Sequence, residues 1–239
     1  MDAKALYQEG RLTEAIAALN AEVRDRPTDV QRRTFLFELL CFAGDYGRAM
    51  KQLDVLVRAD PEATLGVLAY GRVLECEQER ATMFDEGAFP QSAKEPRPVR
   101  GKLNGQPFES LEDADPRVGA RLELIIGGQY SWIPFEHLTS VTVDPPRRLR
   151  DLLWAPVHLQ GGESLAGAEL GDALLPVLTP SASRDEDELV RLGRMTRWVD
   201  LPDGLQVPVG QRMLLVDDED FPILEVRELE IEGLSAPSN

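Results

Sequence analysis

Apolar positions in the first third of the chain recur at helical spacing, and they do so in two related segments. These segments read GRLTEAIAALNAEVRDRP over 10–27 and GDYGRAMKQLDVLVRADP over 44–61. A glycine, an alanine and a proline of the first segment recur 34 residues later in the second, with Gly10, Ala15 and Pro27 matched by Gly44, Ala49 and Pro61. A 34-residue period is that of the tetratricopeptide repeat, a helix-turn-helix unit. Glycine suits its turn and proline suits the end of its second helix.

A third unit begins after the second but is incomplete. Gly71 stands where the first helix of a unit takes a small residue, whereas Gln78 and Met83 replace the next turn glycine and the next contact alanine. Helical repeats need about three neighbours to bury a continuous core. We therefore expect residues 64–86 to dock against the β-rich domain that follows.

In the second half of the chain the apolar runs become short and are separated by turns. The sharpest example is RLELIIGGQYSWI over 121–133, where a Gly-Gly pair between two strand-like runs predicts a hairpin. Acidic residues at the start of 185–193 predict a short helix. Further strands are predicted at 139–144, 155–160, 174–179, 211–218 and 222–231. This spacing favours a small antiparallel sheet or a partly open barrel.

These patterns predict an α+β fold in four parts. A tetratricopeptide-like helical domain occupies 1–86, and a linker rich in proline and glycine follows over 87–107. A β-rich domain is expected over 108–234 and a loose tail over 235–239.

Charge narrows the classes of partner. Asp and Glu number 42 against 26 Lys and Arg, so the formal net charge is -16. A polyanion is repelled by such a surface, which argues against nucleic acid and anionic membranes and favours a basic protein partner.

The sequence also predicts a cytoplasmic location. The most apolar run, 35–44, is about half the length that a bilayer span needs and contains Glu38. The N-terminus lacks the basic and apolar segments of a secretory signal. Cys41 and Cys76 lie in apolar helical patterns, where a free cysteine behaves as a small hydrophobic residue.

Catalytic patterns are lacking in the sequence. His137 and His158 do not have the spacing of zinc ligands. The segment GGESLAG at 161–167 lacks the second glycine of a nucleophile elbow, and the acidic runs at 185–188 and 217–220 lack the form of a calcium loop. We therefore expect no catalytic residues, no cofactor and no metal.

One short segment concentrates basic and apolar residues. DPPRRLRDLLW at 144–154 holds two adjacent prolines, three arginines and a tryptophan. The prolines keep the chain extended, after which three leucines fall on one side of a short helical turn. Arginines are forked donors for carboxylates, so this segment has the character of a structural joint.

At these residues the chain resembles the ImpE/SciE family, also called TagJ, of type VI secretion accessory proteins. The resemblance is carried by 104–138, 145–159, 192–198, 210–215 and 223–230. The matching motif residues, structural or partner-facing, are Asp113, Asp115, Arg117, Trp132, Pro134, Arg147, Arg150, Asp151, Trp154, Trp198, Gln211, Arg212 and Arg227.

The resemblance implies a non-catalytic adaptor that assists assembly or recycling of the contractile sheath. The implied partner is the N-terminal helix of the small sheath subunit, with the sheath-recycling ATPase ClpV as a neighbour. The chain departs from the family at Ser110, where relatives carry tryptophan, and at Leu178 and Thr179, where they carry Arg and Tyr. Relatives also carry a longer helical stretch in place of 87–107.

The four arginines among the motif residues allow two interpretations. Arg117, Arg147, Arg150 and Arg212 either contact a partner or clamp the chain internally. The acidity of the domain favours internal clamps.

The repeat register predicts a partner-binding groove. The first helices of such units line a concave face, which places there Gln31, Thr34, Glu38, Cys41, Leu65, Leu68, Arg72 and Glu75. This groove suits an amphipathic helix with basic flanks. The alternative is that Leu65 and Leu68 pack against the β-rich domain.

Two other function classes remain open at this point. One is a general tetratricopeptide co-chaperone or assembly factor unrelated to secretion. The other is a hydrolase in the β-rich half, which requires a deep pocket with a carboxylate or histidine of perturbed pKa.

Overall fold

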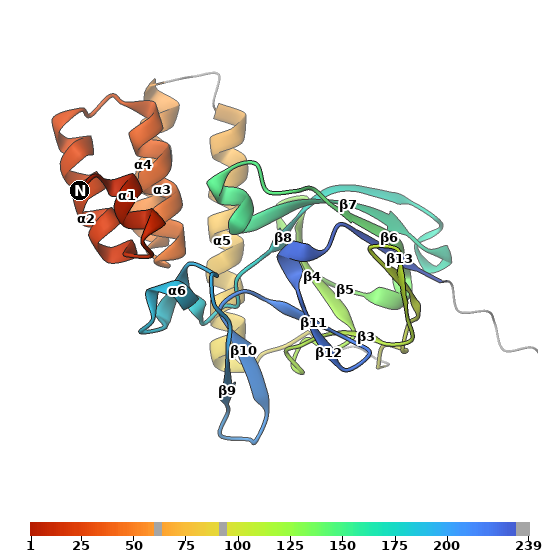
Figure 1. The fold of residues 1–239 in the computed structure, drawn as a ribbon. Helices are drawn as coiled ribbons and strands as arrows, with labels where there is room; N and C mark the ends of the chain where they lie inside the picture. The colour runs from red at the N-terminus through yellow and green to blue at the C-terminus, as the bar shows by residue number, and fades with distance from the viewer. Residues whose placement is uncertain (60–63, 91–94, 233–239) are drawn as a thin grey trace, which may run out of the picture.

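The structure, a computed structural model, describes residues 1–59, 64–90 and 95–232. Helices fill the N-terminal part and strands most of the remainder (Figure 1). The first five helices are α1 (Ala3–Gln8), α2 (Leu12–Asp25), α3 (Val30–Phe42), α4 (Tyr46–Ala59) and α5 (Thr64–Glu86). Among the helices of the described residues, none combines the length and the apolar composition that a membrane crossing requires.

The helices α1 to α4 form two hairpins whose turns are equivalent in sequence. Gly10 and Gly44 have φ angles of +82° and +68°, which glycine adopts without strain. Ala15 and Ala49, which follow these turns, are fully buried where paired helices approach closely. The 34-residue spacing therefore corresponds to two similar helical hairpins, and their assignment to the tetratricopeptide class stays a prediction. Pro61 lies outside the described residues.

The main β-structure is one antiparallel sheet of eight strands in the order β2-β1-β13-β6-β7-β8-β4-β5. Its strands are β1 (Gly101–Leu103), β2 (Gln106–Phe108), β4 (Arg121–Ile126), β5 (Gln129–Pro134), β6 (Leu138–Val143), β7 (Trp154–Gly161), β8 (Glu169–Pro176) and β13 (Glu228–Ile231). The antiparallel arrangement was predicted, but the sheet is larger than expected, since its eight strands run from β2 at one edge to β5 at the other among the described strands. The predicted linker was also too long, since β1 and β2 begin inside 87–107.

Smaller elements complete the β-rich part. A second sheet has three strands, β3 (Leu111–Asp113), β11 (Met213–Val216) and β12 (Glu219–Pro222). A projecting hairpin is formed by β9 (Arg197–Asp200) and β10 (Gln206–Val209). The short helices are α6 (Glu188–Arg191), η2 (Phe135–His137), η3 (Leu149–Leu152), η4 (Glu163–Leu165), η5 (Ala182–Arg184) and η6 (Ile223–Glu225). The predicted strand 211–218 ends at Val216, and 222–231 is interrupted by η6. The predicted tail 235–239 lies outside the described residues.

The predicted hairpin at 121–133 is confirmed. β4 pairs with β5 from Arg121 opposite Pro134 to Ile126 opposite Gln129. Gly127 and Gly128 join them with φ angles of +58° and +74°. Both glycines therefore supply the positive φ angles that a two-residue turn needs.

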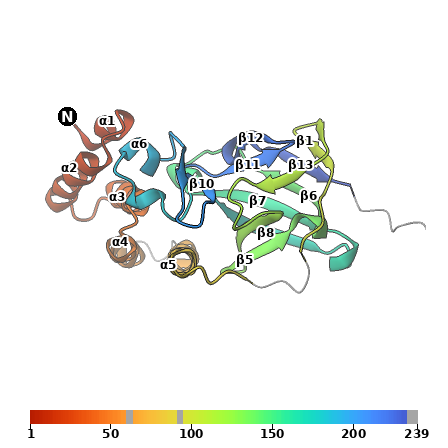
Figure 2. The same ribbon diagram turned by 90° about the horizontal axis from the view of Figure 1, so that it is seen from below.

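The α5 helix stands between α4 and the eight-stranded sheet (Figures 1 and 2). One continuous apolar core includes residues of the first helices, of α5 and of the sheet. The expected docking of residues 64–86 on the β-rich part is confirmed, because α5 packs on β5 and buries Leu74 and Phe84.

Candidate functional site

The joint at 144–154 folds into the short helix η3, which a single carboxylate fixes. The Oδ2 atom of Asp151 accepts the backbone N–H groups of Arg147 at 2.8 Å and of Arg148 at 2.9 Å. Asp151 is buried and follows these residues by four and three positions. This spacing lets one side chain close the turn on its own backbone, so Arg150 within η3 and Trp154 at the end of the joint are held in fixed positions.

Arg150 pairs with Glu38, one of the residues predicted to line the binding groove. The Nε atom of Arg150 lies 3.1 Å from Oε1 of Glu38, and the guanidinium lies 5.2 Å from the ring centroid of Tyr70. Burial raises the pKa of the Glu38 carboxyl, and Arg150 opposes this effect. Glu38 and Cys41 are both buried. Their placement on an open groove was therefore wrong, because η3 folds onto α3 beside Glu38, and Cys41 lines a small cavity with Glu77 and Trp154.

Trp154 connects the joint to α5. It is 2% exposed, and its Nε1–H donates to Oε1 of Glu77 at 2.8 Å. Its ring lies 5.9 Å from that of Tyr70, centroid to centroid. Two side chains of one short segment thus contact α3 and α5 together, as expected of a structural joint.

A buried charge network continues from Glu77 into the sheet. Arg80, 1% exposed, lies 3.2 Å from Glu77 through Nη1, and its Nη2 donates to Glu123 at 3.1 Å. Glu123 also accepts a hydrogen bond from the Tyr130 hydroxyl and lies 3.2 Å from Nε of Arg212. Each buried charge therefore has an opposite charge beside it, as low-dielectric surroundings require.

Arg212 extends this network to β3. It pairs with Asp113 and donates to the carbonyl of Pro176 at 2.9 Å. Burial raises the pKa of Asp113 to about 6, against the opposing effect of Arg212. Burial also favours a higher pKa for Glu123, but Arg80 and Arg212 outweigh it and lower that pKa to about 2. Glu123 therefore stays ionised as the centre of the network.

Sequence reasoning did not identify Glu77, Arg80, Glu123 or Tyr130 as important residues. The available signal was a charged residue within an apolar run. Glu123 stands between leucines in RLELII, and Glu77 and Arg80 lie three residues apart on the buried face of α5. Buried charges of this kind require partners, but the sequence does not say which ones.

Several other motif residues also contact the chain itself. Arg117 bonds Asp115 at 2.8 and 2.6 Å and lies 4.9 Å from the ring centroid of Phe84. Trp132 stacks on Phe89 at 5.8 Å. Gln211 and Arg227 stabilise turns: Gln211 donates to Gly193 O at 3.0 Å, and Arg227 donates to Leu224 O at 2.7 Å. Pro134 is the last residue of β5.

Two motif residues remain on the surface. Trp198 is 38% exposed on β9, and the Arg147 side chain is exposed while its backbone N–H donates to Asp151 of η3. Arg117, Arg150 and Arg212 thus contact carboxylates of the chain itself, in the manner of internal clamps, whereas the Arg147 side chain pairs with no carboxylate among the described residues.

A second segment of the β-rich half covers the helical half. Arg194 donates to the carbonyls of Tyr7 at 2.8 Å and Gln8 at 2.9 Å, and its guanidinium lies 4.6 Å from the Tyr7 ring centroid. Close by, Thr13 N–H donates to Glu188 at 2.8 Å. The region around α6 therefore holds α1 and the start of α2 in place.

The remaining predicted groove residues are accessible. Leu65 and Leu68 are 81% and 61% exposed on α5, and Arg72 and Glu75 beside them are exposed and form an ion pair. The interpretation in which these leucines pack against the β-rich domain was wrong. Arg72 also donates to Gly128 O at 3.2 Å, so this surface borders the β4–β5 turn.

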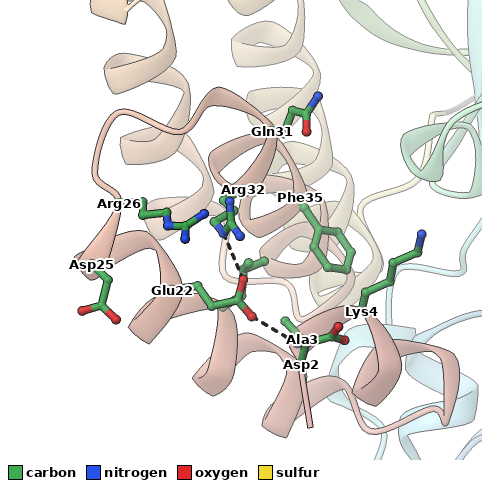
Figure 3. A pocket seen from close by; sticks show the side chains of 10 residues that line it. Asp2, Ala3, Lys4, Glu22, Asp25, Arg26, Gln31, Arg32 and Phe35 are labelled. Atoms are coloured by element: carbon green, nitrogen blue, oxygen red, sulfur yellow. Dashed lines mark hydrogen bonds and ion pairs between the residues drawn. The ribbon is translucent and has the colours of Figure 1, made fainter.

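The other two groove residues, Gln31 and Thr34, lie near the start of α3, exposed and half-buried respectively. Gln31 lines a cavity of about 620 Å³ between α1, α2 and α3 (Figure 3). Phe35 also lines this cavity, and Glu22 spans its lower side by accepting from Ala3 N at 3.3 Å and from Arg32 Nε at 3.1 Å. Its lining includes both acidic and basic side chains.

Possible catalytic groups are sparse. Ser164 Oγ lies 2.8 Å from His137 Nδ1, and His158 pairs with Asp172 across β7 and β8 at 2.6 Å. Within the described residues, no carboxylate is bonded to His137, and no three His, Cys, Asp or Glu side chains are grouped to hold a metal. The Ser164–His137 contact therefore lacks the third group that orients a catalytic histidine.

Comparison with known proteins agrees with this architecture. The chain is 34% identical to the type VI secretion system accessory component TagJ of Pseudomonas aeruginosa, over 99% of this chain and 93% of that protein. A Vibrio parahaemolyticus protein of known crystal structure shares the fold with a TM-score of 0.84 at 21% identity, over 96% of this chain and 97% of the other. The family model for the ImpE protein matches residues 105–230. The chain therefore belongs to the ImpE family.

Proposed function

We propose that this chain is a non-catalytic accessory component of a bacterial type VI secretion system and acts in the cytoplasm. Its 34% identity to an accessory component of such a system over 99% of its length supports this role. In the proposal it binds a helical segment of the small sheath subunit and assists assembly or recycling of the sheath. The ATPase ClpV remains a second proposed neighbour.

The exposure of Leu65 and Leu68 carries the proposal. They lie three residues apart on α5, and are 81% and 61% exposed. Large apolar side chains exposed together mark protein-binding surfaces, and an amphipathic helix is the form of partner that buries such a pair on another helix. The net charge of -16 favours a partner with basic residues.

The position of η3 narrows the proposed site. Because Glu38 is covered by Arg150 of η3 and Cys41 is also buried, a partner helix is expected on the exposed side of α5. Gln31 and Thr34 at the start of α3 stay candidate contacts at a second position.

Titration calorimetry with the full chain and the purified small sheath subunit tests this function. We expect saturable binding that disappears when the N-terminal helix of the sheath subunit is deleted. Competition by a chaperone C-terminal peptide, together with no binding of the sheath subunit, would instead indicate the general co-chaperone role and contradict the proposal.

A further inference from the structure

The exposed side of α5 presents one continuous row of side chains. Their spacing alternates between three and four residues, which keeps them on one face of a helix. All are exposed, and we call them the outward face: Leu65, Leu68, Arg72, Glu75, Glu79, Thr82 and Glu86. The row spans about 30 Å, or roughly six helical turns.

Chemical character changes along the outward face. Its N-terminal end is apolar, with Leu65 and Leu68, and its C-terminal half is acidic. Glu79 and Glu86 form no ion pair within the described part of the chain, whereas Glu75 pairs with Arg72. A hollow of about 600 Å³ follows the acidic half, and its lining includes Glu79, Met83 and Glu86.

The opposite side of α5 fixes the orientation of this face. Glu77, Arg80 and Phe84 are buried, and the first two bond Trp154 and Glu123 of the sheet. Rotation of α5 about its axis breaks these bonds and leaves charges buried without partners, which is strongly unfavourable. A partner therefore meets a surface that is already formed, and binding loses little free energy to ordering.

We infer that the outward face binds an amphipathic helix that is apolar at one end and rich in Lys and Arg at the other. Its apolar end lies over Leu65 and Leu68, and its basic end lies over Glu79 and Glu86. The identity of this helix as part of the small sheath subunit rests on the proposed function. The choice of this surface and the order of the apolar and basic ends follow from the side chains of α5 alone.

A second copy of this chain fits the outward face poorly. Parallel pairing brings the acidic halves together, and antiparallel pairing sets Leu65 and Leu68 of one copy against Glu86 and Thr82 of the other. Like charges repel, and carboxylates lose hydration against leucine. Charge complementarity therefore favours a basic partner helix over self-association.

The test uses the full chain and two synthetic helical peptides that share the same leucine-rich end. One peptide carries lysines at its other end, and the second carries glutamates there. We expect the lysine peptide to bind the native chain. Its affinity for the double variant Glu79→Lys, Glu86→Lys is expected to be about tenfold weaker. The same double variant is expected to bind the glutamate peptide more tightly than the native chain does.

A charge-matched control separates the local effect from net charge. Asp54 on α4 and Glu112 on β3 are exposed acids outside the outward face. The double variant Asp54→Lys, Glu112→Lys is therefore expected to lower the affinity for the lysine peptide by no more than about twofold. The double variant Glu79→Gln, Glu86→Gln removes the same two negative charges without adding positive charge. The inference is overturned if the native chain does not bind the lysine peptide, or if variants of the outward face bind it as the control does.

The sheath subunit distinguishes the two proposals. If it binds the native chain and the Glu79→Lys, Glu86→Lys variant equally, the outward face is the wrong surface and the proposed function stands. If it binds neither while the lysine peptide binds as expected, the surface stands and the proposed function fails.

Discussion

The Nε1–H of Trp154 donates to Oε1 of Glu77 at 2.8 Å inside the protein. Glu77 also pairs with Arg80, and Arg80 pairs with Glu123 of β4. Buried polar contacts thus run from the joint through α5 into the sheet. This continuity makes the helical and β-rich halves one packed unit and fixes the side of α5 that faces solvent.

Removal of the indole donor tests this continuity. Trp154→Phe keeps most of the apolar volume but leaves a buried carboxylate oxygen of Glu77 without its donor. We expect it to lower the free energy of unfolding by about 1–3 kcal/mol, measured by urea denaturation. Trp198→Phe, at a 38% exposed tryptophan, is the matched control and is expected to change it by less than about 0.5 kcal/mol. Equal effects of the two substitutions would argue against a buried bond that couples the halves.

The contact between the joint and α3 gives a second test. Arg150→Ala removes the partner of the buried Glu38, and we expect a loss of about 2 kcal/mol in the free energy of unfolding. Arg147→Ala is the control, because its side chain is exposed. A double-mutant cycle with Glu38→Gln measures the coupling between Arg150 and Glu38. A coupling energy near zero would mean that the ion pair does not hold η3 on the helices.

Acid stability follows from the network around Glu123. Its pKa in the folded protein is about 2, below the ordinary 4.5, so its contribution is present above pH 4.5 and is lost as the pH falls toward 2. We expect the stability difference between the native chain and Glu123→Gln to shrink by on the order of 2 kcal/mol between about pH 4.5 and about pH 2.5.

Asp113 titrates with the opposite sign. Its pKa is raised to about 6 from 3.8, so its contribution is present below pH 3.8 and is lost as the pH rises through 6. The difference in free energy of unfolding between the native chain and Asp113→Asn is therefore expected to shift in favour of the native chain as the pH falls from about 6 to about 3.8. Urea denaturation at a series of pH values measures both variants, and a constant difference for Glu123→Gln would show that this carboxylate is not held ionised by Arg80 and Arg212.

The local part of this fold was predictable from sequence because its signals lie close together. Gly10 and Gly44 marked helix turns, and the pair Gly127 and Gly128 marked a hairpin. Each of these positions depends on a backbone angle that neighbouring residues specify.

Strands that form by pairing with residues far away in the chain could not be predicted from the sequence. β1 and β2 have three residues each, and β1 joins the sheet where Gly101 to Leu103 pair with Ile231 to Leu229, far away in the sequence. No periodicity develops over so few positions, so this segment resembled a linker.

The predicted groove failed in part for the same physical reason. The repeat register placed Glu38 and Leu65 on a common face, but it carries no information about Arg150, which lies 112 residues beyond Glu38 in the chain and covers it. The register was more informative on α5, where Leu65, Leu68, Arg72 and Glu75 are all exposed.

The central claim is that the outward face of α5 binds a partner helix, and Leu68→Asp tests it most directly. Leu68 is 61% exposed, so we expect the substitution to leave the melting temperature unchanged. Calorimetric titration with the small sheath subunit is expected to show a loss of about tenfold or more in affinity, because a charge replaces an apolar contact. Leu205→Asp, at a 38% exposed leucine of the β9–β10 turn, is expected to bind as the native chain does. Native affinity in a folded Leu68→Asp variant would contradict the account.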